Sequence, residues 1–297
     1  MQISVTVSGL SRLFGEDLAG IVDVARVADE AGIHQIVMTD HLAIGPRTDR
    51  YPFAPKFPYP PQEPWPEPLA VLGAFAAATS RIRLGTGVLI APLRSALLLA
   101  KTAATLDVLS RGRIDLGVGT GWQREEFTDP GLPFIGRTAR MEDAVRACRV
   151  IWEHDPPVSF ASDSVSFTDL WVEPRPVQAR LPIWFSGAAN DATVRRVAEL
   201  GDGWLPLGIP IDNVTTTIER MRTAFRDQGR DPETLQIRQS LAVKTDDDGR
   251  MDLAATVAPI SDLAERGVTM VSVALGRFLT GRADIEPFLR DLGGAFS

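Results

Sequence analysis

Residues 80–127 read SRIRLGTGVLIAPLRSALLLAKTAATLDVLSRGRIDLGVGTGWQREEF. This stretch contains two apolar runs typical of buried strands, 82–90 and 113–118, on either side of a helical pattern at 95–109. Each predicted strand ends in a loop that carries glycine. In parallel α/β folds such loops form the ligand-binding face, so this one unit predicts both the fold class and the place of a site.

The same strand–helix unit repeats along the chain. Six further strands are predicted, at 3–7, 35–38, 183–185, 204–207, 235–243 and 269–274. Helical patterns lie between them, at 17–31, 69–78, 137–152, 191–200, 213–228, 252–265 and 285–292. Strict alternation predicts a parallel sheet with right-handed crossovers, and eight units favour a closed (β/α)8 TIM barrel over an open sheet. A chain of 297 residues accommodates this barrel as a single domain.

Two insertions interrupt the alternation. Residues 45–68 are so rich in proline that helix and central strand are both blocked, while the aromatic residues in this insertion (Tyr51, Phe53, Phe57, Tyr59 and Trp65) argue against disorder. We interpret it as a semi-rigid lid over the site, with a surface excursion or a subunit contact as the alternative. Residues 159–172 are interpreted as a small hairpin insertion.

Composition narrows the function classes. The formal net charge of −7 argues against nucleic-acid binding. One cysteine, Cys148, excludes an internal disulfide framework and a thiolate metal cluster, and without a second histidine at a strand end no metal site is expected. No run of about 18 apolar residues predicts a membrane span, and no secretory signal precedes the first strand, so we expect a cytoplasmic protein.

Asp40 and His41 directly follow the predicted strand at 35–38. Barrels place their catalytic groups at these strand ends, and histidine suits proton exchange near neutral pH. We therefore predict that both are catalytic, with Asp40 orienting His41 or bonding a ring nitrogen of a cofactor. The alternative is a structural pair that caps the loop.

Two glycine-bearing segments follow the next strands. The first is Gly85, Thr86, Gly87 and Val88, where glycine permits close approach of a flat ligand or, alternatively, a tight bend in the barrel wall. The second is the segment of Gly117, Val118, Gly119, Thr120, Gly121 and Trp122. It is not a dinucleotide fingerprint, because no helix starts at once and no acidic residue ends the next strand. We interpret it as a backbone wall beside a planar ring.

A third segment, formed by Ser186, Gly187, Ala188 and Ala189, precedes the helical pattern at 191–200. Small residues ahead of a helix expose free N–H groups at the positive end of the helix dipole, and barrels often hold a phosphate in such a place. The alternative is plain helix capping, with Ser186 or Asn190 as the cap.

Taken together, these segments resemble the luciferase-like family of flavin- and deazaflavin-dependent oxidoreductases. The resemblance covers nearly the whole chain and is most specific at 80–94, 103–127 and 182–206. Within the family the chain is most similar to the branch that uses coenzyme F420. The resemblance implies a (β/α)8 barrel with insertions and a cis peptide bond between Gly87 and Val88 that backs the central ring of the cofactor.

The resemblance also implies roles for single residues. His41 matches a histidine near the redox-active ring of F420-dependent sugar-phosphate dehydrogenases, with Asp40 beside it. Trp122 stands where those enzymes carry a glutamate, so that proton donor is not carried over, and Glu125 and Glu126 are expected to serve the start of the next helix. The implied cofactor-binding residues are Asp40, Thr86, Gly87, Val88, Gly119, Thr120, Gly121, Trp122, Ser186, Gly187, Ala188 and Ala189.

The expected activity is hydride transfer between F420 and a small organic substrate. One alternative is an FMN-dependent monooxygenase that uses reduced flavin and O2 and needs a flavin reductase as partner. The other is a barrel that binds a cofactor without turnover. Arg47, Arg50 and Lys56 are candidates for binding the acidic tail of F420. A homodimer is possible, because barrels of this family are often dimers and the apolar helices at 69–78 and 95–109 could pack at its interface.

Overall fold

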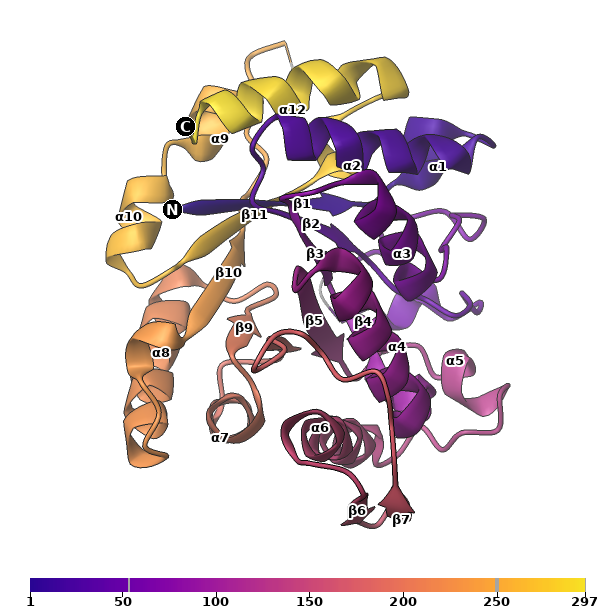
Figure 1. The fold of residues 1–297 in the computed structure, drawn as a ribbon. Helices are drawn as coiled ribbons and strands as arrows, with labels where there is room; N and C mark the ends of the chain where they lie inside the picture. The colour runs from indigo at the N-terminus through magenta and orange to yellow at the C-terminus, as the bar shows by residue number, and fades with distance from the viewer. Residues whose placement is uncertain (53, 249–250, 297) are drawn as a thin grey trace.

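The computed structural model describes residues 1–52, 54–248 and 251–296. Its centre is a closed ring of parallel strands (Figure 1). The ring runs through β1 (Gln2–Val7), β2 (Gln35–Met38), β3 (Arg83–Thr86) with β4 (Leu89–Ile90), β5 (Ile114–Gly119), β8 (Ile183–Ser186), β9 (Gly203–Leu205), β10 (Gln236–Ser240) and β11 (Met270–Ala274). It closes because β1 pairs with β11 and β3 pairs with β5. The predicted (β/α)8 barrel is confirmed.

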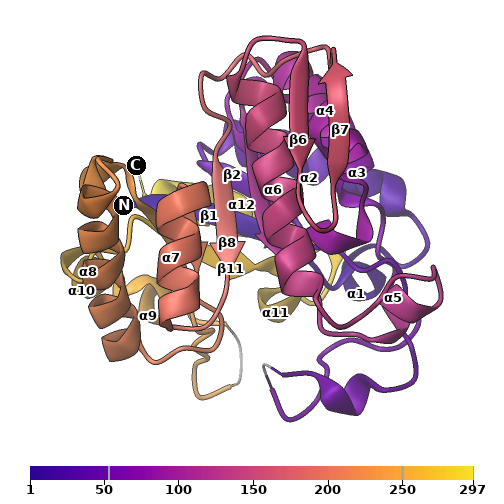
Figure 2. The same ribbon diagram turned by 90° about the horizontal axis from the view of Figure 1, so that it is seen from below.

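Helices surround this ring on the outside (Figures 1 and 2). The longer ones are α2 (Ile21–Glu30), α3 (Pro68–Ala78), α4 (Ala96–Ser110), α6 (Arg137–Glu153), α7 (Asp191–Leu200), α8 (Ile211–Asp227) and α12 (Ile285–Gly294). Three short helices lie in loops that follow strands: α1 (Leu10–Phe14), α5 (Glu125–Thr128) and α11 (Leu275–Phe278). Phe53 of the insertion lies outside the described residues.

The apolar core has two parts. Most of it lies between the strands and the helices, where side chains such as Val5, Ile36 and Leu84 are fully buried. A smaller cluster of Trp184, Leu205 and Met270 packs with Val88 inside the barrel. The interior is therefore filled by side chains below the mouth, which is the usual arrangement of such barrels.

Two predicted elements differ from the structure at identifiable residues. The strand predicted at 82–90 is divided into β3 and β4, and the peptide bond between Gly87 and Val88 is cis, as the resemblance implied. The helix predicted at 252–265 is divided at Pro259 into α9 (Leu253–Val257) and α10 (Ile260–Glu265). Proline has no N–H and its ring clashes with the preceding turn, so the helix cannot continue through it.

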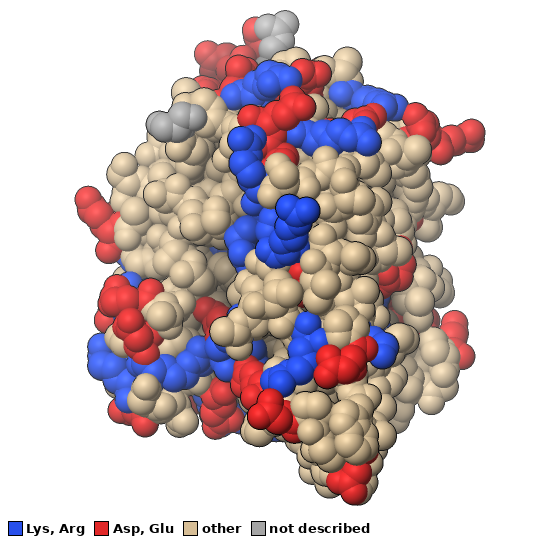
Figure 3. All heavy atoms as spheres, in the orientation of Figure 1, with Lys and Arg blue, Asp and Glu red and all other residues tan. Residues whose placement is uncertain are grey.

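Outside the barrel, β6 (Val158–Ala161) and β7 (Ser166–Leu170) form an antiparallel pair beside α6 (Figure 2). On the face shown in Figure 3, basic and acidic side chains are interleaved. Among the residues that the structure describes, no helix is both long enough and apolar enough to span a bilayer.

Candidate active site

His41 lies just past β2, at the mouth of the barrel, and is bound by Glu126 of α5. Nδ1 of His41 is 3.0 Å from Oε2 of Glu126, whose side chain is fully buried. The backbone N–H of Leu42 also donates to Oε1 of Glu126, at 2.7 Å. Because an ionised carboxylate only accepts hydrogen bonds, Nδ1 carries the proton. Nε2 forms no hydrogen bond with any described residue and is left for proton exchange.

Sequence reasoning missed this role of Glu126. Glu125 and Glu126 do lie in the first turn of α5, as expected. However, Glu126 is 1% exposed and points to His41 instead of merely stabilising the helix start. The available signal was an acidic residue in the loop after β5, which lies two strands along the ring from β2, because a catalytic histidine needs a partner that orients it.

Asp40 does not orient His41, and that part of the prediction is wrong. Its Oδ2 accepts hydrogen bonds from the backbone N–H of Ile90 at 2.8 Å and from Nη1 of Arg94 at 2.6 Å. Arg94 in turn pairs with Glu67, at the end of the insertion. Asp40 therefore fixes the segment after the cis peptide bond, which agrees with the structural alternative for this residue.

The two glycine-bearing segments meet the third segment at the mouth. A Cβ on Gly119 would lie 2.6 Å from Cγ2 of Val88 and 3.9 Å from Cβ of Ser186. Gly121 has φ +69°, and a side chain there would collide with Ile90. Glycine at these positions therefore lets the segments pack closely on one another, and their use as a wall beside a flat ligand stays a prediction.

Thr86 lies in the same region, but its hydroxyl already forms a hydrogen bond within the barrel wall. Its buried hydroxyl donates to the carbonyl oxygen of Gly117 at 2.6 Å and so ties β3 to β5. Thr120 is partly exposed at the end of β5. Trp122 follows, with its ring centroid 5.8 Å from that of His41.

The segment from Ser186 to Ala189 joins β8 to α7. The side chain of Asn190, and not that of Ser186, caps the helix by accepting from the N–H of Thr193 at 2.9 Å. The indole N–H of Trp204 holds the carbonyl oxygen of Gly187 at 3.0 Å. The backbone N–H groups of Gly187, Ala188 and Ala189 donate to no described residue. These groups suit the oxygens of a phosphate.

The insertion at 45–68 packs on the histidine. The ring of Trp65 lies 4.7 Å from that of His41, and Phe57, which is 5% exposed, lies 5.9 Å away. Tyr51 contacts Trp122 at 5.3 Å. Each is an edge-on contact of the kind that aromatic rings favour. The insertion thus surrounds His41 with aromatic side chains.

Several buried polar atoms at the mouth of the barrel lack a hydrogen-bond partner among the described residues. They are Nε1 of Trp65 and both amide atoms of Gln123, a residue that is 1% exposed. Buried polar groups are nearly always hydrogen-bonded, so these atoms are available to a ligand or to water. Together with the small residues at the mouth and the free N–H groups after β8, they fit a flat-ring cofactor that carries a phosphate.

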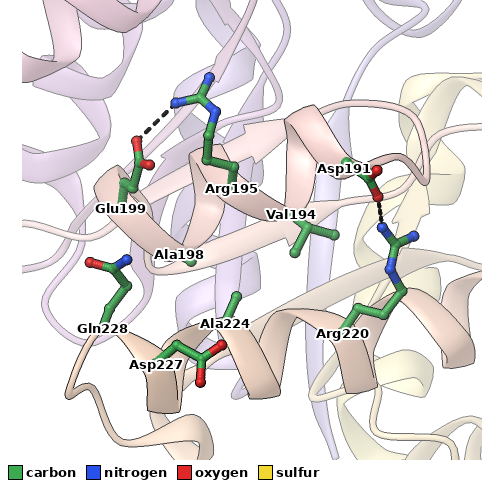
Figure 4. Close-up of a pocket in the computed structure, with 9 residues that line it drawn as sticks. All are labelled: Asp191, Val194, Arg195, Ala198, Glu199, Arg220, Ala224, Asp227 and Gln228. Atoms are coloured by element: carbon green, nitrogen blue, oxygen red, sulfur yellow. Dashed lines mark hydrogen bonds and ion pairs between the residues drawn. The ribbon is translucent and has the colours of Figure 1, made fainter.

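Two cavities bear on where a ligand could enter. One of about 360 Å³ lies next to the insertion and is lined by Gly9, Ser11, Tyr59, Glu63 and Arg277, among others. The other, of about 240 Å³, is a groove between α7 and α8, where Arg195 pairs with Glu199 and Arg220 pairs with Asp191 (Figure 4). The first opens beside the candidate site, whereas the second belongs to the outer helix layer.

The described residues contain no group of three or more His, Cys, Asp or Glu side chains that could hold a metal ion. Of the basic residues considered for an acidic tail, Arg47 is paired with Asp49 at 2.7 Å. Arg50 and Lys56 are exposed.

Enzymes with a (β/α)8 barrel carry their active sites at the C-terminal mouth, which is where His41 and Glu126 lie. The chain belongs to the luciferase-like monooxygenase family, whose family model matches residues 2–278.

Curated relatives match parts of the chain. An uncharacterised protein of Mycobacterium tuberculosis is 33% identical over 165 residues, and the match spans 56% of this chain and 58% of that relative. The phthiodiolone/phenolphthiodiolone dimycocerosates ketoreductase of M. tuberculosis is 31% identical over 237 residues, or 76% of this chain and 61% of the ketoreductase. The chain thus spans little more than half the length of these relatives.

Solved structures share the fold. The monooxygenase RslO1 from Streptomyces bottropensis superposes with a TM-score of 0.78 at 21% identity, covering 99% of this chain and 98% of RslO1. An F420-dependent secondary alcohol dehydrogenase in complex with an F420–acetone adduct also gives a TM-score of 0.78, at 18% identity, covering 99% of this chain and 97% of the dehydrogenase.

Proposed function

We propose that the chain is an F420-dependent oxidoreductase that transfers hydride between the deazaflavin and a small organic substrate. The observation that carries the proposal is the His41–Glu126 pair, placed under aromatic side chains at the barrel mouth. When bound, F420 supplies a hydride at C5 and does not activate oxygen readily. The chain itself then has to hold the ring, exclude water and move a proton.

Each of these tasks has residues that suit it. Gly87, Val88 and Gly119 would form the wall beside the ring, and the N–H groups after β8 would hold the phosphate. Phe57, Trp65 and the other aromatic residues around His41 would keep water out. His41 would exchange the proton at Nε2, while Glu126 keeps the ring in one orientation.

The relatives support a carbonyl or alcohol as the reacting group. One curated relative is a ketoreductase, and one fold neighbour is an F420-dependent secondary alcohol dehydrogenase. Reduction of a ketone needs a hydride at carbon and a proton at oxygen. In this proposal His41, when it carries a second proton on Nε2, would give that proton to the oxygen, and the hydride for the carbon would come from the bound cofactor, so that the product is an alcohol.

The alternative within the same fold is an FMN-dependent monooxygenase, which would use reduced flavin and O2 and would depend on a flavin reductase. The family description and the likeness to RslO1 support it. A barrel that binds a cofactor without turnover remains the third possibility. The His41–Glu126 pair argues against it, because the pair fixes the imidazole while Nε2 has no hydrogen-bond partner among the described residues, an arrangement that binding alone does not need.

Titration of the purified protein with F420 and with FMN tests the proposal. Tryptophan fluorescence reports binding, because Trp65 and Trp122 lie beside His41. Tight F420 binding with weak FMN binding supports the F420-dependent oxidoreductase. Tight FMN binding with weak F420 binding supports the FMN-dependent monooxygenase instead. Binding of neither cofactor contradicts both.

A further inference from the structure

Arg238 of β10 is a buried cation inside the barrel. The residue is 7% exposed, and its guanidinium carbon lies 5.7 Å from the ring of Trp184 in the interior cluster. Nη1 donates to Oε1 of Gln35 at 2.6 Å, and this is its one hydrogen bond to a described residue. Burial lowers the pKa of Arg238 to about 10, against the opposing effect of Asp115, so the side chain stays charged at neutral pH.

No carboxylate of a described residue pairs with this cation. Asp115 is the acidic group nearest in the network, but both of its oxygens already pair with Arg83, at 2.6 and 2.8 Å. Gln35 bridges the two charges, because its Nε2 donates to Asp115 at 2.7 Å while its Oε1 accepts from Arg238. The network thus holds two cations and one anion. His34 lies close enough to feel the charges of Asp115 and Arg83.

The other buried arginines among the described residues are paired. Arg149 contacts Asp202 at 2.5 Å, and Arg196 contacts Glu142 at 2.8 Å. Burying a charge without a counter-ion is expensive. Arg149 and Arg196 are therefore buried together with a counter-ion, whereas Arg238 is buried without one among the described residues.

The position of Arg238 in the barrel gives a reason for burying its charge without a counter-ion. Nη2 of Arg238 lies 2.9 Å from the point where a Cβ on Gly87 would be. Gly87 begins the cis peptide bond, and Val88 packs on the same interior cluster as Trp184. The guanidinium therefore lies directly under the segment that is proposed to back the cofactor ring.

We infer that Arg238 is the counter-cation for negative charge on the ring of the bound cofactor. This inference rests on the proposed function. The pyrimidine end of the reduced ring ionises at an N–H in deazaflavins and flavins alike. A cation beneath the ring stabilises this anion, so the bound ring should lose the proton at lower pH than the free cofactor does. An anionic group of the substrate that binds next to Arg238 is the other source of such a negative charge.

The test is a spectrophotometric pH titration of the reduced cofactor, free and bound to the wild-type protein, Arg238→Met and Arg238→Lys. Arg226→Met is the control, because Arg226 is an exposed cation on α8 that lines neither of the two cavities. The titration is repeated with His41→Asn, since His41 and its partner Glu126 are other ionisable groups at this mouth.

We expect the ring to ionise at lower pH in the wild-type complex than in solution. Arg238→Met should move the transition up by about one pH unit or more, Arg238→Lys should retain most of the effect, and Arg226→Met should change nothing.

Two results would overturn the inference while leaving cofactor binding intact. One is a bound ring that ionises at the same pH as the free cofactor. This result is measured with the wild-type protein alone and does not depend on the folding of Arg238→Met. The other is an unmoved ring transition in Arg238→Met combined with a tenfold or greater loss of affinity for a carboxylate-bearing substrate analogue, which would assign the charge to the substrate. Failure of the wild type to bind either cofactor contradicts the proposed function instead.

Discussion

Nδ1 of His41 lies 3.0 Å from one carboxylate oxygen of Glu126 and 3.1 Å from the other. The carboxylate is fully buried, and the N–H of Leu42 holds one of its oxygens. One nitrogen of the imidazole is therefore fixed, and the chemistry that we assign to His41 has to take place at the other.

Replacing His41 with Asn should lower turnover by about 10² or more at saturating cofactor and substrate, because a positioned general acid or base contributes at least that much. Steady-state kinetics measure the loss. His154→Asn is the control, since His154 follows the end of α6 and has no contact with the site. Wild-type turnover in His41→Asn would remove the residue from the mechanism.

Replacing Glu126 with Gln should lower kcat by about tenfold or more with little change in KM, because the partner of a catalytic imidazole sets its tautomer and orientation. The ¹⁵N NMR signals of His41 should show the proton on Nδ1 in the wild type and a mixture of tautomers in the variant. A normal tautomer together with reduced activity would mean that Glu126 acts in another way.

Cys148 should resist alkylation in the folded protein. The side chain is 1% exposed, and burial raises its pKa to about 12, so almost no thiolate exists at pH 8. Mass spectrometry after iodoacetamide treatment should find Cys148 unmodified in buffer and fully modified in denaturant. Fast labelling of the native protein would show that this part of the core opens.

Asp202 should make the fold sensitive to acid. It accepts hydrogen bonds from Arg149, Arg180 and Arg230. Burial opposes its ionisation, but the charges of Arg149 and Arg180 outweigh burial and hold the pKa of this carboxyl below its usual range. A lowered pKa in the folded state means that the carboxylate stabilises the fold above its unfolded pKa of about 3.9, and that this stabilisation is lost as the pH falls through the folded value.

Asp202→Asn should therefore cost about 3 kcal/mol in the free energy of unfolding at pH 7, and the difference from wild type should shrink toward pH 3. Urea unfolding at the two pH values measures this. Asp155→Asn removes a carboxylate that is 98% exposed and should have little effect. A difference that is equal at both pH values would contradict the electrostatic account.

We also predict a homodimer through α4. Leu98 and Leu109 on this helix are 63% and 65% exposed, and Trp171 and Val177 on the segment beside it are 67% and 58% exposed. Clustered apolar exposure of this kind marks interaction surfaces. Light scattering should give a dimer for the wild type and a monomer for the double variant Leu98→Glu with Leu109→Glu. Ile135→Glu changes an exposed apolar residue elsewhere and should stay dimeric, while a monomeric wild type would contradict the prediction.

The barrel and the gathering of the candidate segments at one mouth could be predicted because both follow from periodic patterns. Apolar runs alternate with helical patterns, and the ends of parallel strands necessarily gather on one face. The segments around Gly87, Gly119 and Ser186 were expected to meet for this reason, and Gly119 does lie between Val88 and Ser186.

The partners of single side chains could not be predicted in the same way. Asp40 and His41 are adjacent in sequence, but neighbouring residues in extended chain point in opposite directions, and their carboxylate and ring reach different loops. Which of Glu125 and Glu126 faces His41 depends on how α5 is rotated. The isolation of Arg238 depends on Arg83 having already taken Asp115, a relation among three strands.

The insertion over His41 is fastened at both of its ends. Gly45 lies so close to Gln123 and Glu125 that a side chain there would not fit, while Glu63 accepts from the N–H of Leu10 and from the hydroxyl of Ser11. These contacts near both ends oppose a swing of the whole segment as a hinged flap. A substrate would reach His41 by the parting of aromatic rings, so its residence time would depend on ring packing and not on a domain motion.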